Sequence, residues 1–298
     1  MKNLIVENKY DGKKLTRFLS YKFPDLDINV VYKALRKKDI IINTKRISDN
    51  VTVYENDSIT IYITDEFLYS KTIELNIVYE DDNILVINKP NGIAVTNDKN
   101  NETSLSDLVK NKYSGSNFIP MPCHRIDRNT TGLVIYAKTS ESLEFLLQKF
   151  ELREITKNYI CVVVGIPKNQ KEKLNAYLFK DNKKSLVFVS DIPRKGYLPI
   201  ITSYKVLAEN TEKEISLLDV NIETGRTHQI RAHLAYIGYP ILGDGKYGIN
   251  NINKSFKVTS QLLCGYKLRF DFKEYPTKYK YLTNMEFEID FNHISKYI

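Results

Sequence analysis

Residues 124–132 read His-Arg-Ile-Asp-Arg-Asn-Thr-Thr-Gly and place one carboxylate, Asp127, between Arg125 and Arg128, directly before an apolar run. Nearby cations favour the ionised form of a carboxyl group, and an ionised Asp can act as a nucleophile. We therefore expect Asp127 to be catalytic. The alternative is a solvated ion-pair cluster that contributes little, and the spacing alone does not decide between the two.

A second polar segment, residues 224–233 (Thr-Gly-Arg-Thr-His-Gln-Ile-Arg-Ala-His), opens a helix that we predict over residues 227–237. Thr227 can cap the free amides of this helix, and Gly238 can take the left-handed conformation that ends it. Arg231 lies beside the buried stripe of the helix, which consists of Ile230, Leu234 and Ile237. A partly buried guanidinium needs a carboxylate partner, because an unpaired buried charge is very costly.

Three of the four histidines, His124, His228 and His233, lie in these two segments. Five positions separate His228 from His233, whereas two metal ligands on one helical face lie three or four apart. We expect no metal, and we expect the imidazoles to hydrogen-bond to backbone groups or to the substrate. The three cysteines are too far apart for a zinc site and should pack in the core. The chain also lacks a Gly-rich phosphate loop and a nicotinamide fingerprint, so we expect no cofactor.

The segment around Asp127, which continues into Ala-Lys-Thr at residues 137–139, resembles the signature of the RluA-type RNA pseudouridine synthases. Three further segments occur in the order found in that family. One lies upstream, at residues 87–92 (Ile-Asn-Lys-Pro-Asn-Gly), and two lie downstream, at residues 157–159 (Lys-Asn-Tyr) and 224–233. The four segments together span most of residues 74–270. The resemblance implies an enzyme that flips specific uridines out of an RNA and isomerises them. The large-subunit ribosomal RNA is the expected substrate.

The resemblance also implies roles for individual residues. Asp127 would attack the ribose or remove a ribose proton, Arg231 would pair with Asp127, and Tyr159 would stack on the uracil. Arg125 would fill the gap that the flipped base leaves. Further substrate-binding residues are expected to be His124, Arg128, Lys157, Arg226 and His228. Two alternatives remain: Tyr159 packs in the core as a strand residue, and Arg231 pairs with some other acid.

Composition and charge agree with a globular RNA-binding protein. The chain has 298 residues, of which 42% are apolar, and its 44 basic and 36 acidic residues give a net charge of +8. Such a charge favours a polyanionic partner, with nucleic acid the commonest and an anionic membrane surface the rival. We find no apolar run of transmembrane length and no h-region of a signal peptide. We therefore expect a cytoplasmic monomer that does not bind membranes.

Residues 1–63 form a predicted small basic domain. Residues 1–60 hold twelve basic and eight acidic residues, a net charge of +4, which is half of the excess of the whole chain. Two amphipathic helices followed by strands at residues 40–42 and 58–62 resemble the S4 RNA-binding domain. Phosphate contacts are expected from Lys33, Arg36, Lys37, Lys45 and Arg46. The alternative is a pair of ordinary amphipathic helices with solvated charged faces.

We predict a linker at residues 64–73 and a catalytic domain at residues 74–298. Apolar runs predict strands over residues 75–79, 84–88, 133–137, 159–165, 186–189, 202–207, 215–222 and 265–270. Helices are expected over residues 105–112, 140–150 and 227–237. Many strands with few helices indicate an α+β domain with a mixed, largely antiparallel sheet. The rival functions are a non-catalytic RNA-binding ribosome-assembly factor and, less favoured, a metal-dependent nuclease.

Overall fold

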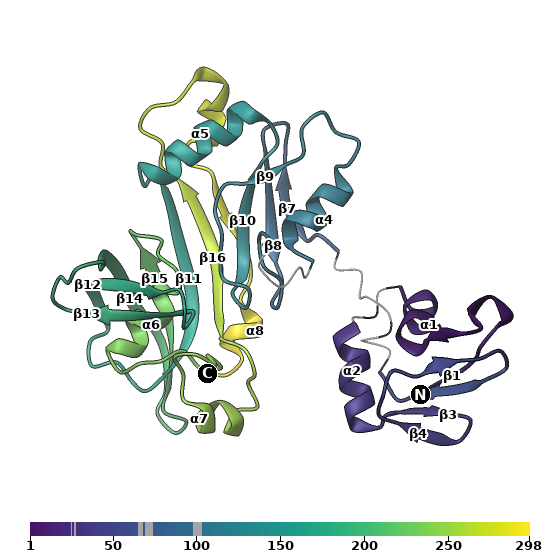
Figure 1. Ribbon diagram of the computed structural model, residues 1–298. Helices are drawn as coiled ribbons and strands as arrows, with labels where there is room; N and C mark the ends of the chain where they lie inside the picture. Colours follow the sequence, from purple (N-terminus) through teal and green to yellow (C-terminus); the bar gives the residue numbers. More distant parts are fainter. Residues whose placement is uncertain (25, 27, 65–67, 69–73, 98–102) are drawn as a thin grey trace. The chain divides into compact units, whose positions relative to one another are not determined.

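The computed structural model describes residues 1–24, 26, 28–64, 68, 74–97 and 103–298. In it the chain forms two compact units, Met1–Glu74 and Leu75–Ile298 (Figure 1). Apart from Thr64 and Leu68, the linker predicted at residues 64–73 lies outside the described residues. No helix in the described part of the chain is long and apolar enough to cross a membrane.

The N-terminal unit packs two short helices, α1 (Leu15–Lys22) and α2 (Ile28–Lys37), against an antiparallel sheet. The order of its strands is β1 (Lys2–Ile5), β6 (Ser58–Ile61), β3 (Ile40–Ile42) and β4 (Lys45–Ile47), while β2 (Lys13–Lys14) pairs with β5 (Thr52–Val53). Apolar residues at helical spacing are the buried ones, including Leu15, Phe18, Leu19, Val31, Ala34 and Leu35. Basic residues between them are exposed, which is the amphipathic arrangement that the sequence indicated.

The second unit is built on one eleven-stranded sheet. The main order is β13 (Leu186–Ser190), β12 (Lys171–Asp181), β14 (Leu198–Asn210), β15 (Ile215–Ile222), β11 (Ile155–Val164), β16 (Leu263–Phe270), β10 (Thr131–Ala137), β8 (Ile84–Lys89) and β7 (Ile77–Glu80). In addition, β17 (Glu286–Glu288) pairs with β16 and β9 (Met121–Pro122) with β10. Among the described strands, only β10 and β16 run parallel to each other. The predicted α+β class with a largely antiparallel sheet is confirmed.

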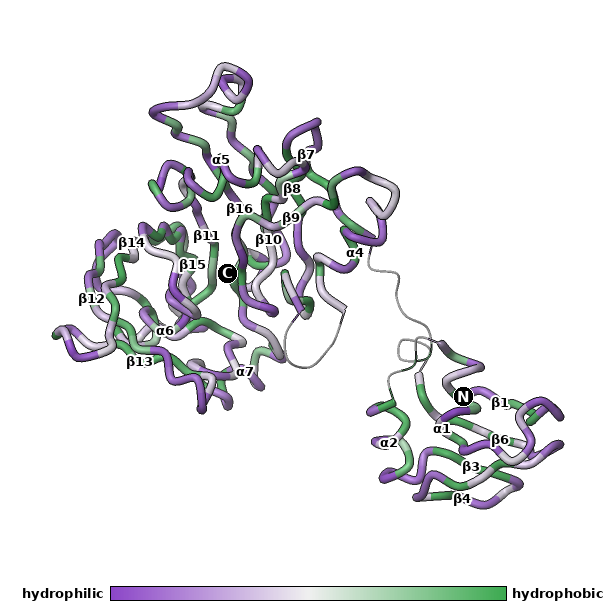
Figure 2. The backbone as a smooth tube through the Cα atoms, turned by 45° about the horizontal axis from the view of Figure 1, so that its top comes forward, coloured by the Kyte–Doolittle hydropathy of each residue, from purple (hydrophilic) through white to green (hydrophobic). Residues whose placement is uncertain are grey.

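The central strands of this sheet are buried on both faces, and Figure 2 shows the hydrophobic stretches along β8, β10 and β11. Neighbouring side chains on a strand point to opposite faces. On β10, Val134 belongs to the core cluster that includes Val109 of α4 (Leu105–Lys112), whereas Ile135 belongs to the cluster that includes Leu146 of α5 (Ser140–Glu151). Helices therefore cover both faces of the sheet. Further helices of this unit are α6 (Gln229–Tyr236), α7 (Asn250–Ser255) and α8 (Asn292–Ser295).

The beginning of α6 corrects the prediction from sequence. The helix begins at Gln229 rather than Thr227, and its N-cap is His228, which makes no side-chain cap hydrogen bond. The Gln229 side chain organises the preceding turn instead: Oε1 accepts hydrogen bonds from Thr224 Oγ1 at 2.9 Å and Arg226 N at 3.1 Å, and Nε2 donates to β14 at Ile201 O at 3.0 Å. These tertiary contacts override the local capping preference of Thr227. The expected left-handed conformation of Gly238 is present, with φ 89°.

Candidate active site

Asp127 lies on the loop between β9 and β10, and hydrogen bonds fix this loop at several points. The Thr130 N–H donates to Asp127 O at 3.0 Å, and the Gly92 N–H donates to Arg128 O at 3.1 Å. From the segment before β16, Gln261 Nε2 donates to Thr130 Oγ1 at 2.8 Å. A site is precise when its backbone is held by such contacts, so the loop presents the Asp127 carboxylate from a fixed position.

The strand that follows the loop approaches β16 very closely. Gly132 pairs with Gly265 in the parallel contact and has a φ of 114°, a conformation that side chains strongly disfavour. A Cβ at Gly132 would overlap the backbone of Gly265. Glycine is therefore required here, and the contact sets where β10 begins and hence where the Asp127 loop ends.

Lys89, at the end of β8, is fully buried and binds the same loop from the other side. Its Nζ donates to the carbonyl oxygens of Pro90, Ile93 and Arg128, each at 2.8 Å. Burial lowers the pKa of Lys89 to about 7, but three carbonyl acceptors need the three N–H donors that only the ammonium form has. Lys89 thus links the segment of residues 87–92 to the Asp127 loop.

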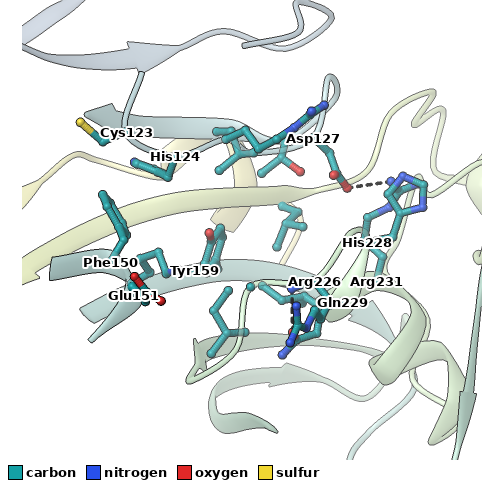
Figure 3. A pocket seen from close by; sticks show the side chains of 18 residues that line it. Cys123, His124, Asp127, Phe150, Glu151, Tyr159, Arg226, His228, Gln229 and Arg231 are labelled. Atoms are coloured by element: carbon teal, nitrogen blue, oxygen red, sulfur yellow. Dashed lines mark hydrogen bonds and ion pairs between the residues drawn. The ribbon is translucent and has the colours of Figure 1, made fainter. Parts of the chain in front are cut away.

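Arg231 on α6 pairs with Asp127, as the resemblance implied, and also with Asp244. Arg231 Nη1 lies 2.9 Å from Asp127 Oδ2 (Figure 3). Its Nε and Nη2 donate to the two oxygens of Asp244 at 2.7 and 2.9 Å. Asp244 is fully buried and the Asp127 side chain is 25% exposed. Arg231 therefore pairs both with Asp127, as the resemblance implied, and with another acid, Asp244, as the alternative held.

The two carboxylates keep Arg231 charged inside the protein. Burial opposes that charge, but the hydrogen bonds and negative charge of Asp244, with those of Asp127, outweigh it and raise the pKa of Arg231. Burial likewise opposes the charge of Asp244, but the contact with Arg231 lowers the pKa of Asp244. A buried bidentate pair of this kind is geometrically specific, so Arg231 is oriented before any ligand binds.

Asp127, Tyr159 and Arg231 surround one pocket, which we call the inner pocket (Figure 3). Its volume is about 420 Å³, within the usual range for small-ligand sites. Tyr159 on β11 is only 7% exposed and belongs to the core, yet it also lines this pocket. Burial and the negative charge of Asp127 raise the pKa of Tyr159. Its hydroxyl therefore stays protonated, and the ring combines core packing with a face on the pocket.

Other residues singled out in the sequence line the inner pocket too: His124, Arg125, Lys157, Arg226 and His228. His124 Nε2 accepts a hydrogen bond from Ile135 N at 3.1 Å, which leaves only Nδ1 as a donor. Burial lowers the pKa of His124 to about 3, so its imidazole is neutral. Lys157 Nζ lies 5.4 Å from the centroid of the Phe150 ring, and burial lowers the pKa of Lys157.

A second, polar pocket of about 520 Å³ adjoins the first and shares Asp127 and Arg231 with it; we call it the outer pocket. Its lining includes five further cationic side chains: Arg125, Arg128, Lys180, Arg226 and Lys246. Of the two pockets, Arg128 lines only the outer one, and its contact with substrate stays a prediction. A cation-rich pocket of this kind suits the phosphates of a nucleic acid.

The five basic residues predicted in the N-terminal unit are exposed. Lys33, Arg36 and Lys37 lie on α2, and Lys45 and Arg46 lie on β4. Arg46 Nη1 donates to Lys38 O at 2.6 Å, so its guanidinium is partly oriented by the protein. The other four are exposed to solvent, and the contact of all five with RNA stays a prediction.

Sequence reasoning missed Asp244 and Lys89 as parts of the site. The need of Arg231 for a carboxylate was recognised, but the chain has 36 acidic residues and only the fold selects Asp244. Lys89 was seen within residues 87–92, yet its burial depends on β8 meeting the Asp127 loop. Within the described ranges, no cluster of three or more His, Cys, Asp or Glu side chains could hold a metal ion.

Comparisons with known proteins identify the family of the chain. Residues 83–236 match the RNA pseudouridylate synthase family. A protein of Mycoplasma capricolum described as an uncharacterized RNA pseudouridine synthase is 30% identical over 297 residues, which cover 94% of this chain and 95% of that protein. Ribosomal large subunit pseudouridine synthase C of Rickettsia bellii is 33% identical over 262 residues, which cover 82% of this chain and 86% of that protein.

Among solved structures, human RNA pseudouridylate synthase domain containing 4 shares the fold. The TM-score is 0.58 at 21% identity, and the match covers 74% of this chain and 93% of the human chain. The family match spans more than half of the chain and includes Asp127, Tyr159 and Arg231. The chain therefore belongs to the RNA pseudouridine synthase family and is an isomerase that converts uridine to pseudouridine in RNA.

Proposed function

We propose that this isomerase modifies specific uridines of large-subunit ribosomal RNA, with Asp127 as the catalytic residue. The contact of 2.9 Å between Asp127 and Arg231 supports this assignment most directly. The Asp127 carboxylate is accessible from the inner pocket, and it is paired with the Arg231 guanidinium that Asp244 holds in place. The relative from Rickettsia bellii is named as a ribosomal large subunit enzyme, which supports large-subunit ribosomal RNA as the substrate.

The reaction rearranges bonds within one nucleoside. The bond between ribose C1′ and N1 of uracil breaks, the base turns over, and a bond between C1′ and C5 forms. C5 loses its proton and N1 gains one, so atoms balance without a second substrate. Asp127 begins the reaction either by attacking C1′ or by removing a ribose proton. Both routes need a carboxylate oxygen near the ribose, and the contact with Arg231 holds that of Asp127 at the inner pocket.

The uridine must leave its RNA helix to reach Asp127, at a cost of a few kcal/mol that is smallest in loops. In the inner pocket the uracil stacks on the ring of Tyr159, which is a common way to hold an unstacked base. Arg125 is exposed and lines both pockets. It is therefore placed to occupy the gap that the flipped base leaves in the RNA.

RNA backbone contacts come from two sets of cations. Those of the outer pocket bind the phosphates next to the flipped nucleotide, because they lie beside Asp127. Residues 1–63 act as an S4-like RNA-binding domain. Five of its side chains contact RNA phosphates: Lys33, Arg36, Lys37, Lys45 and Arg46. Such contacts add affinity and orient the RNA without reading its sequence.

Mapping of pseudouridine in ribosomal and transfer RNA, from cells with and without the protein, tests the proposal. We expect one or more positions of large-subunit ribosomal RNA to lose the modification. The wild-type chain should restore it and the Asp127→Asn chain should not. Loss confined to transfer RNA would contradict the proposed substrate, and restoration by Asp127→Asn would contradict the catalytic assignment.

A further inference from the structure

Tyr247 connects several parts of the site but has no role in the function proposed above. Its N–H donates to Asp244 Oδ1 at 3.1 Å. Its hydroxyl oxygen lies 2.8 Å from His228 Nδ1 and accepts a hydrogen bond from Val187 N at 2.9 Å. The guanidinium carbon of Arg231 lies 5.3 Å from the centroid of its ring. One side chain thus contacts both the cation that pairs with Asp127 and an imidazole of the pocket wall.

The direction of the hydrogen bond between Tyr247 and His228 follows from the number of donors. The hydroxyl oxygen already accepts the Val187 N–H, so its own proton is available for His228 Nδ1. The opposite direction would leave the hydroxyl proton without an acceptor in the described part of the chain. Burial lowers the pKa of His228 to about 4, so the neutral imidazole carries a single proton. That proton is therefore on Nε2.

His228 holds this Nε2–H at the wall of the site, beside Asp127 and Arg231 (Figure 3). The residue lines both pockets, and among the described residues its Nε2 has no hydrogen-bond partner. Its backbone φ is 53°, a left-handed conformation that residues other than glycine rarely adopt. Such conformations cluster at functional sites, where a side chain must occupy one position.

We propose that Tyr247 is a positioning residue that keeps His228 protonated on Nε2, and that His228 donates this proton in a hydrogen bond to the 2′-oxygen of the target nucleotide. The inference rests on the proposed function, because it requires the ribose to lie at Asp127. The 2′-hydroxyl is the polar group on the carbon next to C1′. A neutral donor suits a hydroxyl oxygen, whereas the charged phosphates are matched by the cations of the outer pocket.

Nitrogen NMR of the free protein tests the positioning step without any RNA. We expect the His228 nitrogens to show a neutral imidazole protonated on Nε2, and Tyr247→Phe to give a mixture of the two neutral forms. The matched control is Tyr236→Phe, since Tyr236 donates its hydroxyl to Asp191 Oδ2 at 2.9 Å on an exposed face. A wild-type His228 protonated on Nδ1 would overturn the inference.

Turnover tests whether Tyr247 acts through His228. Tyr247→Phe retains the ring against Arg231, so we expect kcat/KM for RNA to fall only about tenfold, the effect of one hydrogen bond. In a His228→Ala background the same substitution should cause no further loss, because the effects of coupled residues are not additive. A full additional loss in that background would show that Tyr247 acts by another route and would overturn the proposal.

An RNA whose target uridine lacks the 2′-hydroxyl tests the contact itself. Wild-type protein should bind the natural RNA about tenfold more tightly than the 2′-deoxy RNA, because the site then loses one hydrogen bond. His228→Ala should bind both RNAs equally, and an unchanged preference would contradict the contact. Activity of Asp127→Asn would contradict the proposed function. That result is distinguishable from a failure of this inference, because the protonation of His228 is measured without substrate.

Discussion

Asp244 binds Arg231 through both of its carboxylate oxygens, at 2.7 Å to Nε and 2.9 Å to Nη2. This contact leaves Nη1 for Asp127 and aims it at the pocket. The residue proposed to carry out the reaction is thus the accessible end of a three-residue ion-pair chain whose other end is fully buried. The orientation of the guanidinium therefore depends on an acid that touches no substrate.

Replacing Asp127 with Asn should abolish pseudouridine formation, by about ten-thousandfold or more, because an amide neither attacks C1′ nor removes a proton. The Asn oxygen can still accept from Arg231, so the urea unfolding midpoint and RNA affinity should change little. Turnover of a purified RNA substrate measures the effect, with Asp82→Asn on an exposed turn as the control. Appreciable residual activity would show that another group performs the first step.

Replacing Asp244 with Asn should destabilise the protein by about 3 kcal/mol or more, because it removes a charge partner from a buried guanidinium. Activity should fall as well, since Arg231 is then free to turn away from Asp127. Urea unfolding gives the stability, and the exposed Asp82→Asn is again the matched control. Equal unfolding free energies for the two variants would show that Asp127 alone is sufficient to hold Arg231.

Replacing Lys33, Arg36 and Lys37 of α2 with Ala should weaken binding to long RNA and lower the slope of log affinity against log salt by about two. The three side chains are exposed, so the fold should be unchanged. A control that removes the same charge from the other unit is Lys171, Lys205 and Lys254 to Ala. If both triple variants lose the same slope, the N-terminal unit has no special role in RNA binding.

Because His233 is buried, we expect the free energy of unfolding to fall in mild acid. It is 2% exposed, its Nδ1 lies 3.0 Å from Thr202 Oγ1, and burial lowers its pKa to about 4. Its stabilising contribution is therefore complete above the unfolded pKa of about 6.5 and is lost as the pH falls toward 4. Between about pH 7.5 and pH 5 the unfolding free energy should drop by about 2 kcal/mol from this residue alone.

His233→Gln provides the comparison for that loss, because Gln can hydrogen-bond to Thr202 but does not titrate. Urea unfolding of both proteins at the two pH values isolates the share of His233 from those of His124 and His228, whose pKa values burial also lowers. The same pH dependence in both proteins would show that His233 is not protonated on unfolding.

Local patterns were sufficient to predict much of the fold. The apolar runs that became β8, β10, β11 and β15 are buried strands, and α4 covers the predicted residues 105–112. The predicted helix at residues 140–150 is α5, which Thr139 caps by accepting from the Ser142 N–H. These features depend on a few neighbouring residues. By contrast, β12 was missed because one of its faces is exposed and carries charged residues such as Lys171 and Lys173.

Only the site residues that lie within the recognised sequence motifs could be predicted. The contact between Asp127 and Arg231 joins two motifs that the family resemblance already linked, and it is present. Asp244 and Lys89 carry no local signal, because their burial depends on strands that are distant in sequence. The left-handed backbone of His228 could not be predicted from neighbouring residues either, since contacts of Gln229 with β14 decide where α6 begins.

The pairing of β10 with β16 has a consequence for protein synthesis. The Asp127 loop is held by Gln261, and β10 starts against Cys264 and Gly265, more than a hundred residues later in the chain. Contacts of such long sequence separation form late. A nascent polypeptide still attached to its ribosome therefore lacks a finished catalytic loop until Gln261, Cys264 and Gly265 have emerged. We expect a chain truncated before residue 260 to be inactive, because the loop then has none of these partners.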